Sequence, residues 1–235
     1  MENNNNTEKV KSAPKRKGAQ NPDKRRAVKR ADKAPAAKAV NQRPAKKPVK
    51  RVKHKGNAVR IIFLGGVGEI GKNMTAIECG DDIIIIDAGA IFPTDETPGF
   101  DLIVPDITYL LERKKKVRGV VLTHGHEDHI GGVTYLLKEL KVPVAGTKLT
   151  LALVDNKLRE HRINDAKLIT IKPDQPFQLG CFKVRPVNVN HSIAGSLALA
   201  IETPQGVIFH SGDYKIDLTP VAGDPIDLKT ISELG

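Results

Sequence analysis

The sequence predicts an α/β sandwich in which two mixed sheets pack together and helices lie outside them. Three observations lead to this prediction. Strand-like segments come first (58–86), helices then alternate with strands (107–161), and strands dominate the later part of the chain (168–210). A regular alternation of strand and helix would instead indicate a simple parallel sheet. With 235 residues the chain is long enough to bury a substantial core.

Each element is predicted from its local pattern. Runs of β-branched residues indicate strands, and apolar residues spaced three and four apart indicate helices. The run Ile83–Ile86 consists of four isoleucines, as in a strand buried on both faces. In chain order the predicted elements are strands at 59–64, 74–78 and 83–86, a helix at 107–116, a strand at 119–122, a helix at 132–140, a strand at 142–145, a helix at 149–161, strands at 168–171, 182–189, 197–202 and 207–210, and a short helix before the last residue.

The N-terminal segment 1–57 differs in composition from the rest of the chain. It carries 19 Lys and Arg residues against 4 Asp and Glu, whereas residues 58–235 carry 19 against 23, so the formal net charge of +11 arises wholly from this segment. Because it has few large apolar side chains to offset the entropy of ordering, we predict a disordered basic tail. Such a tail would attract RNA without reading its sequence. A solubilising tail, or one that contacts acidic proteins or membrane surfaces, is the alternative.

Two further features bound the cellular setting. Cys79 and Cys181 are too few for a disulfide framework, and each adjoins a glycine in an apolar stretch, so we expect buried, reduced thiols. No apolar run approaches the roughly 20 residues that span a bilayer, and the N-terminus has no secretory signal. These features favour a cytoplasmic protein without a membrane segment.

The run His124–His129 (His-Gly-His-Glu-Asp-His) carries the strongest chemical signal. It directly follows a predicted strand and precedes two glycines and a helix. Two histidines two residues apart point the same way from an extended backbone, and the Asp and His past the bend can serve a neighbouring metal. Imidazole and carboxylate donors together suit zinc and similar divalent ions. A chance polar loop is a poor alternative, because such side chains seldom cluster without partners.

Three more candidate donors lie at the ends of predicted strands. Asp87 ends the run of isoleucines, where a carboxylate needs a partner, and His191 and Asp213 follow later strands. Each alone reads equally well as a turn residue, a helix cap or a buried histidine. Together with the His/Asp run they form the donor set of a two-metal centre, with Asp213 as the candidate bridging carboxylate. Two metal ions about 3.5–4 Å apart can orient a phosphodiester and stabilise its departing oxygen.

These residues resemble motifs one to four of the metallo-β-lactamase superfamily. A finer resemblance is to the ribonuclease J family of its β-CASP nuclease branch. It extends from about residue 58 to 235 and is strongest in the segments Leu64–Asn73, Ile86–Gly89, Thr123–Gly132, His191–Ile193 and Ser211–Lys215. It implies that residues 58–235 form an incomplete metallo-β-lactamase αββα sandwich, at least its N-terminal half. The family's β-CASP and C-terminal domains have no counterpart in this sequence, so we expect a longer protein.

The resemblance also implies roles for the site residues. Two zinc ions are implied, the first held by His124, His126 and His191 and the second by Asp128 and His129, with Asp213 bridging and Asp87 orienting a ligand imidazole. The candidate catalytic residues are accordingly Asp87, Asp128, His129 and Asp213. A later family histidine for the second zinc has no match here, so we expect an incomplete second site.

The activity that the resemblance implies is that of a zinc-dependent ribonuclease. It would combine 5′-to-3′ exonuclease and endonuclease action on 5′-monophosphorylated RNA, in RNA maturation, including that of ribosomal RNA, and in mRNA decay. The resemblance further implies a homo-oligomer (dimer or tetramer) with RNA-decay partners.

Several alternatives compete with this interpretation. The glycines of segment 66–71, followed by Asp87, have the spacing of a dinucleotide fingerprint, but β-like residues follow where that motif needs a helix, so we favour a tight hairpin. His210 beside Ser211 suggests a hydrolase triad, yet no Gly-x-Ser-x-Gly elbow is present. A hydrolase of a thioester, lactone or β-lactam, or an RNA-binding fragment without activity, would share most of these features.

Overall fold

The computed structural model describes residues 58–94, 97, 99–221 and 223–235. The predicted basic tail at 1–57 lies outside this range. Among the described residues, no helix is both long and apolar enough to cross a membrane.

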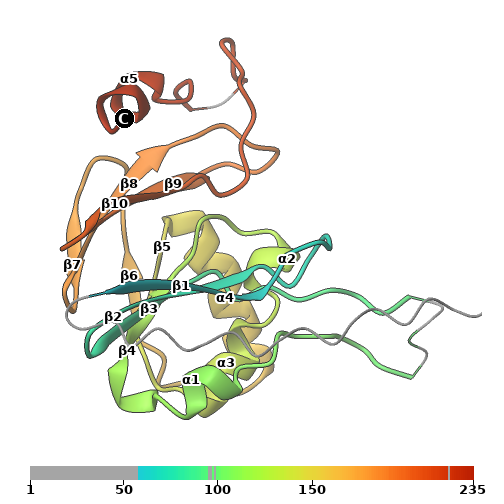
Figure 1. Cartoon of the computed structure of the whole chain (residues 1–235). Helices are drawn as coiled ribbons and strands as arrows, with labels where there is room; N and C mark the ends of the chain where they lie inside the picture. Colours follow the sequence, from blue (N-terminus) through green and yellow to red (C-terminus); the bar gives the residue numbers. More distant parts are fainter. Residues whose placement is uncertain (1–57, 95–96, 98, 222) are drawn as a thin grey trace, which may run out of the picture. The chain divides into compact units, whose positions relative to one another are not determined.

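The larger of two sheets contains six strands in the order β1-β2-β3-β4-β5-β6 (Figure 1). The first three form an antiparallel meander, and β3 to β6 run parallel, so this sheet is mixed as predicted. The isoleucines of β3 are fully buried because the sheet is covered on both faces. The strands are β1 (Val59–Gly65), β2 (Met74–Cys79), β3 (Asp82–Ile86), β4 (Val117–Val121), β5 (Val144–Gly146) and β6 (Leu168–Thr170).

Helices cover one face of this sheet. They are α1 (Thr108–Leu111), the 3₁₀ helix η1 (Lys114–Lys116), α2 (Glu127–Ile130), α3 (Val133–Glu139) and α4 (Lys148–Glu160). Apolar residues of α1 to α4 pack with the outward side chains of the sheet in one core cluster. The helix predicted over 107–116 is split into α1 and η1, because Arg113 between them has a non-helical backbone, with φ −124° and ψ 25°.

The second sheet has four strands in the order β10-β9-β8-β7. They are β7 (Phe177–Leu179), β8 (Phe182–Asn188), β9 (Leu197–Thr203) and β10 (Gly206–His210). All its pairings within the described residues are antiparallel, so the prediction of two mixed sheets is wrong for this one. Hairpins join β7 to β8 and β9 to β10, and such short connections can only link antiparallel strands.

The two sheets pack face to face around a shared core. Phe182 and Leu199 of the second sheet are fully buried against Ile84 and Ile86 of β3. The opposite face of the second sheet packs against α5 (Leu228–Glu233), the short terminal helix that was predicted (Figure 1). The layers are therefore helices, sheet, sheet and helix, which confirms the predicted αββα sandwich.

The two cysteines differ in exposure, although both were expected to be buried. Cys79 is buried at the end of β2, whereas Cys181 is exposed. The expectation for Cys181 is wrong because Gly180, with φ +57°, turns the chain between β7 and β8 and places the thiol on the surface. Cys181 Sγ donates to the carbonyl of Cys79 at 3.7 Å.

Strand ends from both sheets meet along one edge of the sandwich. β3 and β4 are parallel neighbours, and β8 and β10 share a direction because both are antiparallel to β9. Their carboxyl ends lead into the segments that carry the predicted donors. The amide of Leu197, at the start of β9, donates to the carbonyl of Thr123 at 2.9 Å, which joins the two sheets at this edge.

Candidate metal centre

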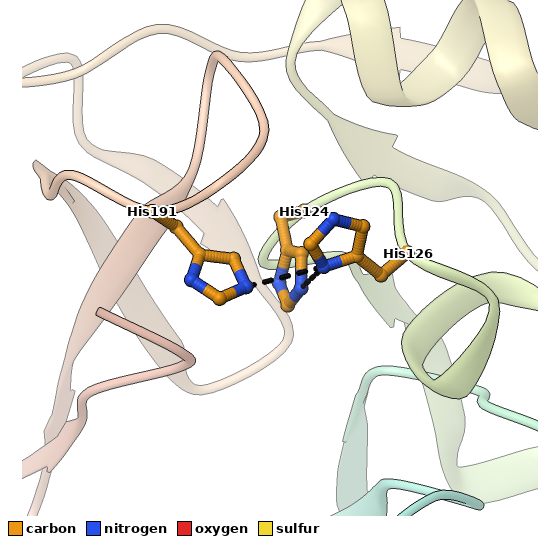
Figure 2. A group of neighbouring side chains, drawn as sticks. All are labelled: His124, His126 and His191. Atoms are coloured by element: carbon orange, nitrogen blue, oxygen red, sulfur yellow. Dashed lines mark hydrogen bonds between the residues drawn. The ribbon is translucent and has the colours of Figure 1, made fainter. Parts of the chain in front are cut away.

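Three histidine side chains converge at the edge where the two sheets meet. His124 and His126 follow β4, and His191 lies in the connection between β8 and β9. His126 Nδ1 lies 3.0 Å from His124 Nε2 and 3.1 Å from His191 Nε2 (Figure 2). Three imidazole nitrogens gathered in this way can hold one divalent ion.

Helix α2 positions the middle of the His/Asp run. His126 stands before its first residue with an extended backbone, and Glu127 and Asp128 occupy the first turn, where negative charge complements the helix dipole. Gly125 permits a close approach to α4, since a Cβ there would lie 2.6 Å from Leu153 Cδ1. The sequence pattern did not predict α2, because its four residues are too few to show helical periodicity.

A second group of donors adjoins the first and contains His124, Asp128 and His129. His129 Nε2 lies 3.5 Å from Asp128 Oδ2. Asp213, which follows β10, places Oδ1 at 3.5 Å from His129 Nε2 and Oδ2 at 3.6 Å from His191 Nε2. The two oxygens of Asp213 therefore face one histidine of each group, as a bridging carboxylate would.

Asp87 lies beneath this second group and is almost completely buried. Its Oδ2 accepts hydrogen bonds from His129 Nδ1 at 2.7 Å and from Thr123 Oγ1 at 2.9 Å, and its Oδ1 accepts from the Thr123 amide at 2.8 Å. Because His129 Nδ1 donates a hydrogen bond to Asp87, the neutral form of His129 has its lone pair on Nε2, which points into the centre.

Thr123 extends the same arrangement to the first group. Its only hydroxyl proton goes to the Asp87 carboxylate, so Thr123 Oγ1 accepts from His124 Nδ1 at 3.0 Å. His124 Nε2 is thereby left without a proton and faces His126. No role for Thr123 was predicted from the sequence. The one signal for such a role was its position directly before His124, at the end of a strand.

The electrostatics of the centre match a metal-binding donor set. Burial and the neighbouring His129 lower the pKa of His124 to about 3, so this imidazole is neutral at pH 7. Burial lowers the pKa of His129, but its hydrogen bond to Asp87 and the nearby carboxylate charges of Asp87, Asp128 and Asp213 together hold that pKa above the usual value. Burial raises the pKa of Asp87, yet the same bond keeps it below its usual range, so the carboxylate stays charged. The neutral imidazole of His124 beside the charged Asp87 carboxylate fits a donor set for zinc and similar divalent ions.

The alternatives based on a dinucleotide site and on a hydrolase triad are not supported. Residues after the glycine-rich segment form strand β2 where a fingerprint would require a helix, so the hairpin prediction is confirmed. His210 Nδ1 accepts from the Gly212 amide at 3.2 Å, and Ser211 Oγ donates to the Gly212 carbonyl at 2.9 Å. His210 thus ends β10, and no described hydrogen bond joins it to the Ser211 hydroxyl.

Comparison with known proteins places this centre in a family. Residues 94–224 match the family model described as the β-lactamase superfamily domain. The chain belongs to the β-lactamase superfamily. Its fold is the predicted metallo-β-lactamase sandwich, and the prediction of a metallo-β-lactamase resemblance is confirmed.

Curated relatives within the superfamily carry the name ribonuclease J. The chain is 46% identical over 181 residues to Ribonuclease J of Synechocystis sp., and this match covers 76% of the chain and 28% of that protein. It is 44% identical over 178 residues to Ribonuclease J of Mycolicibacterium smegmatis, covering 75% of the chain and 32% of that protein. The predicted resemblance to ribonuclease J is confirmed, and the chain spans less than a third of the length of these two relatives.

Solved structures with lower identity share the fold. A protein of unknown function from Enterococcus faecalis superposes with a TM-score of 0.53 at 22% identity, over 68% of this chain and 44% of that one. Unliganded yeast PDE1 superposes with a TM-score of 0.53 at 15% identity, over 76% of this chain and 72% of that one. These likenesses support the sandwich architecture alone.

Proposed function

We propose that this chain is the metal-binding catalytic part of a ribonuclease that hydrolyses RNA phosphodiester bonds with two zinc ions. One observation carries the proposal: the three-histidine group and the Asp128–His129 pair face the two oxygens of a single carboxylate, Asp213. Two adjacent divalent ions are the usual means of hydrolysing phosphodiesters. The relatives named ribonuclease J supply the substrate class.

Each side chain of the centre takes a defined part in this proposal. His124, His126 and His191 hold the first ion, Asp128 and His129 hold the second, and Asp213 bridges them. Asp87 acts through His129, whose ring it orients and whose Nδ1 proton it accepts in a hydrogen bond. When bound, the ions activate water and stabilise the charge that develops on the scissile phosphate.

The remaining parts of the proposal concern the whole protein. Residues 58–235 form part of the catalytic domain, and β-CASP and C-terminal domains complete the longer protein. That protein acts in the cytoplasm as a homo-oligomer on 5′-monophosphorylated RNA, both as a 5′-to-3′ exonuclease and as an endonuclease, in RNA maturation and mRNA decay. The basic segment 1–57 adds contacts to RNA phosphates.

The proposal is tested by offering the chain two chemically different substrates in the presence of Zn²⁺. One is a 5′-monophosphorylated RNA, with the 5′-hydroxyl form of the same RNA as its control, and the other is a thioester. We expect RNA cleavage that stops on chelation and in His126→Ala, which removes the nitrogen at the middle of the three-histidine group. Turnover of the thioester without RNA cleavage would contradict the proposal and favour another hydrolase of this superfamily.

A further inference from the structure

We propose that Asn73 is a positioning residue of the metal centre, and that Gly66 keeps the Asn73 amide in place. Asn73 would fix the Asp128 carboxylate beside His129, and so set the affinity of the second metal ion. This inference rests on the two-metal centre proposed above. It also gives a specific role to the glycine-rich segment 66–71. The proposed reaction assigns that segment no other role.

The Asn73 side chain lies against both donors of the second group. Its Nδ2 donates to the Asp128 carbonyl at 3.1 Å and to Asp128 Oδ2 at 3.3 Å, and it lies 3.1 Å from His129 Nε2. These contacts join residues 55 and 56 positions apart in the chain. Apart from the Asn73 amide, the described contacts of Asp128 Oδ2 include only His129 Nε2 at 3.5 Å, so this amide supplies the hydrogen bond that directs the carboxylate.

The chemistry of the neighbours settles which end of the amide faces them. The carbonyl and carboxylate oxygens of Asp128 can only accept hydrogen bonds. Two oxygens that can only accept therefore face this end of the side chain, and only the NH₂ end of Asn73 fits the position.

Gly66 packs directly on the other end of the Asn73 amide. A Cβ at Gly66 would lie 2.5 Å from Asn73 Oδ1, closer than real Cβ atoms come to another atom. Gly66 has φ +82°, which also favours glycine. A side chain at position 66 would therefore push the amide away from Asp128. The glycine at position 66 thus has a physical reason connected to the metal centre.

A purely structural role for Asn73 would be to close the hairpin between β1 and β2. The hairpin, however, is held by the backbone pairing of β1 with β2, and two backbone bonds of Asn73 tie it to α2 and to the segment after β3. The Asn73 N–H donates to the Asp128 carbonyl at 3.0 Å, and the Asn73 carbonyl accepts from Gly89 at 2.9 Å. Because Asn73→Ala keeps both bonds, it removes the positioning contact and leaves the hairpin in place.

Cobalt(II) titration of the full chain, followed by visible absorption, separates the two binding steps. We expect Asn73→Ala to bind the first ion as the wild type does, and the second about tenfold or more weakly. Gly66→Ala should weaken the second step in the same way. When Gly66→Ala is added to Asn73→Ala, the second step should weaken no further, because the side-chain amide that an alanine at position 66 displaces is already absent. Thermal unfolding without metal measures any general loss of stability.

A matched control is Asn188→Ala, which removes another partly buried amide. Asn188 Nδ2 donates to the carbonyls of Asp224 and Pro225 at 3.1 and 3.0 Å and contacts no candidate ligand. Its loss should leave both cobalt steps unchanged. An unchanged second step in Asn73→Ala, or an equal weakening of both steps with a lower melting temperature, overturns the role of Asn73. A wild-type chain that binds no second ion overturns the two-metal centre and this inference with it.

Discussion

Asp87 combines an unusual backbone conformation with a central place in the hydrogen-bond network. Its φ is +59°, a region that costs side chains other than glycine about 1–3 kcal/mol. The conformation is held by neighbouring backbone bonds: the Asp87 amide donates to Val121 and the Ala88 amide donates to the carbonyl of His129. Glycine would adopt this backbone more easily, so the carboxylate itself must justify the strain. Its contacts with Thr123 and His129 supply that reason.

Asp87→Asn tests whether this carboxylate sets the protonation of a ligand histidine. Asparagine tolerates the same backbone conformation, but an NH₂ group in place of Oδ2 would face His129 Nδ1. The proton of His129 is then expected to move to Nε2, which removes the lone pair that faces the centre. Metal affinity at the second position should fall about 10–100-fold. ¹⁵N NMR of the imidazoles reports the tautomer directly, and a proton that stays on Nδ1 in the variant would contradict the prediction.

Glu78 of β2 is a second buried carboxylate. Its described contacts include none of the candidate metal ligands. Arg60 contacts its Oε2 at 2.7 Å, and the Tyr109 hydroxyl donates to the same oxygen. Burial raises the pKa of Glu78, but these hydrogen bonds outweigh burial and hold the pKa below its usual value of 4.5. A carboxyl with a depressed pKa in the folded state stabilises the fold above its unfolded pKa. That contribution is lost as the pH falls through the lower folded value.

Glu78→Gln is therefore expected to reduce the free energy of unfolding by about 1–3 kcal/mol at pH 7. The difference from the wild type should begin to shrink below pH 4.5, where the unfolded chain protonates Glu78 first, and it should be lost below the lower pKa of the folded carboxyl. Urea unfolding at several pH values measures both effects. Glu112→Gln is a suitable control because Glu112 is exposed and pairs only at the surface with Arg113. If the loss of unfolding free energy in Glu78→Gln grew towards acid pH, the predicted direction of the pH dependence would be wrong.

At the scale of single elements, the sequence predicted those whose burial is uniform or periodic. The isoleucines of β3 and the apolar stripe of α4 (Leu151, Val154 and Leu158) are buried as expected. Two short elements were missed, β7 with three residues and α2 with four, whereas β5 and β6, equally short as β7, were found from their apolar residues. The two missed elements form only because tertiary contacts hold them, so local pattern cannot reveal them.

The segment after β3 and helix α2 meet at a glycine that local pattern also leaves unexplained. A Cβ at Gly89 would lie 1.6 Å from the Asp128 carbonyl oxygen and 2.8 Å from the backbone nitrogen of Asn73. The backbone of three segments therefore meets at this position. No side chain fits unless α2, which carries Asp128 and His129, moves away from β3.

Gly89→Ala is accordingly expected to destabilise the fold by roughly 3 kcal/mol or more. It should also weaken metal binding, because α2 must shift. Gly80→Ala is the matched control: nothing lies within 4 Å of its Cβ position, and φ +60° alone makes the change unfavourable. We expect about 1 kcal/mol for the control. Denaturant unfolding of both variants decides the matter, and equal losses would contradict the close packing at Gly89.

At the scale of the whole molecule, the candidate donors were predictable because they end strands. Asp87, His191 and Asp213 each follow a strand, and the sandwich brings those strand ends to one edge. Asn73 and Thr123 were not predictable in their roles. Their contacts with Asp128 and Asp87 join segments 55 and 36 positions apart, and they depend on backbone approaches that composition does not encode. Sequence reasoning thus found the charged and imidazole donors but not the neutral side chains that orient them.

The charge division of the chain leads to the last prediction. Segment 1–57 holds 19 of the 38 Lys and Arg residues, and residues 58–235 alone have more acidic than basic side chains. If the segment binds RNA phosphates through counterion release, deleting it should lower RNA affinity and flatten the salt dependence. The slope of log K against log salt should fall by about 0.7 for each phosphate contact that is lost. Metal content should stay unchanged, since every candidate donor lies beyond residue 57.

A version of the chain with the same residues of 1–57 in scrambled order is the matched control for that deletion. Because counterion release depends on charge and not on sequence, the scrambled version should keep both the affinity and the salt slope of the wild type. Fluorescence anisotropy with a single-stranded RNA at several salt concentrations measures both quantities. An affinity that survives the deletion would place RNA binding in residues 58–235, and a scrambled version that binds as weakly as the deletion would mean that the segment recognises RNA through a specific structure.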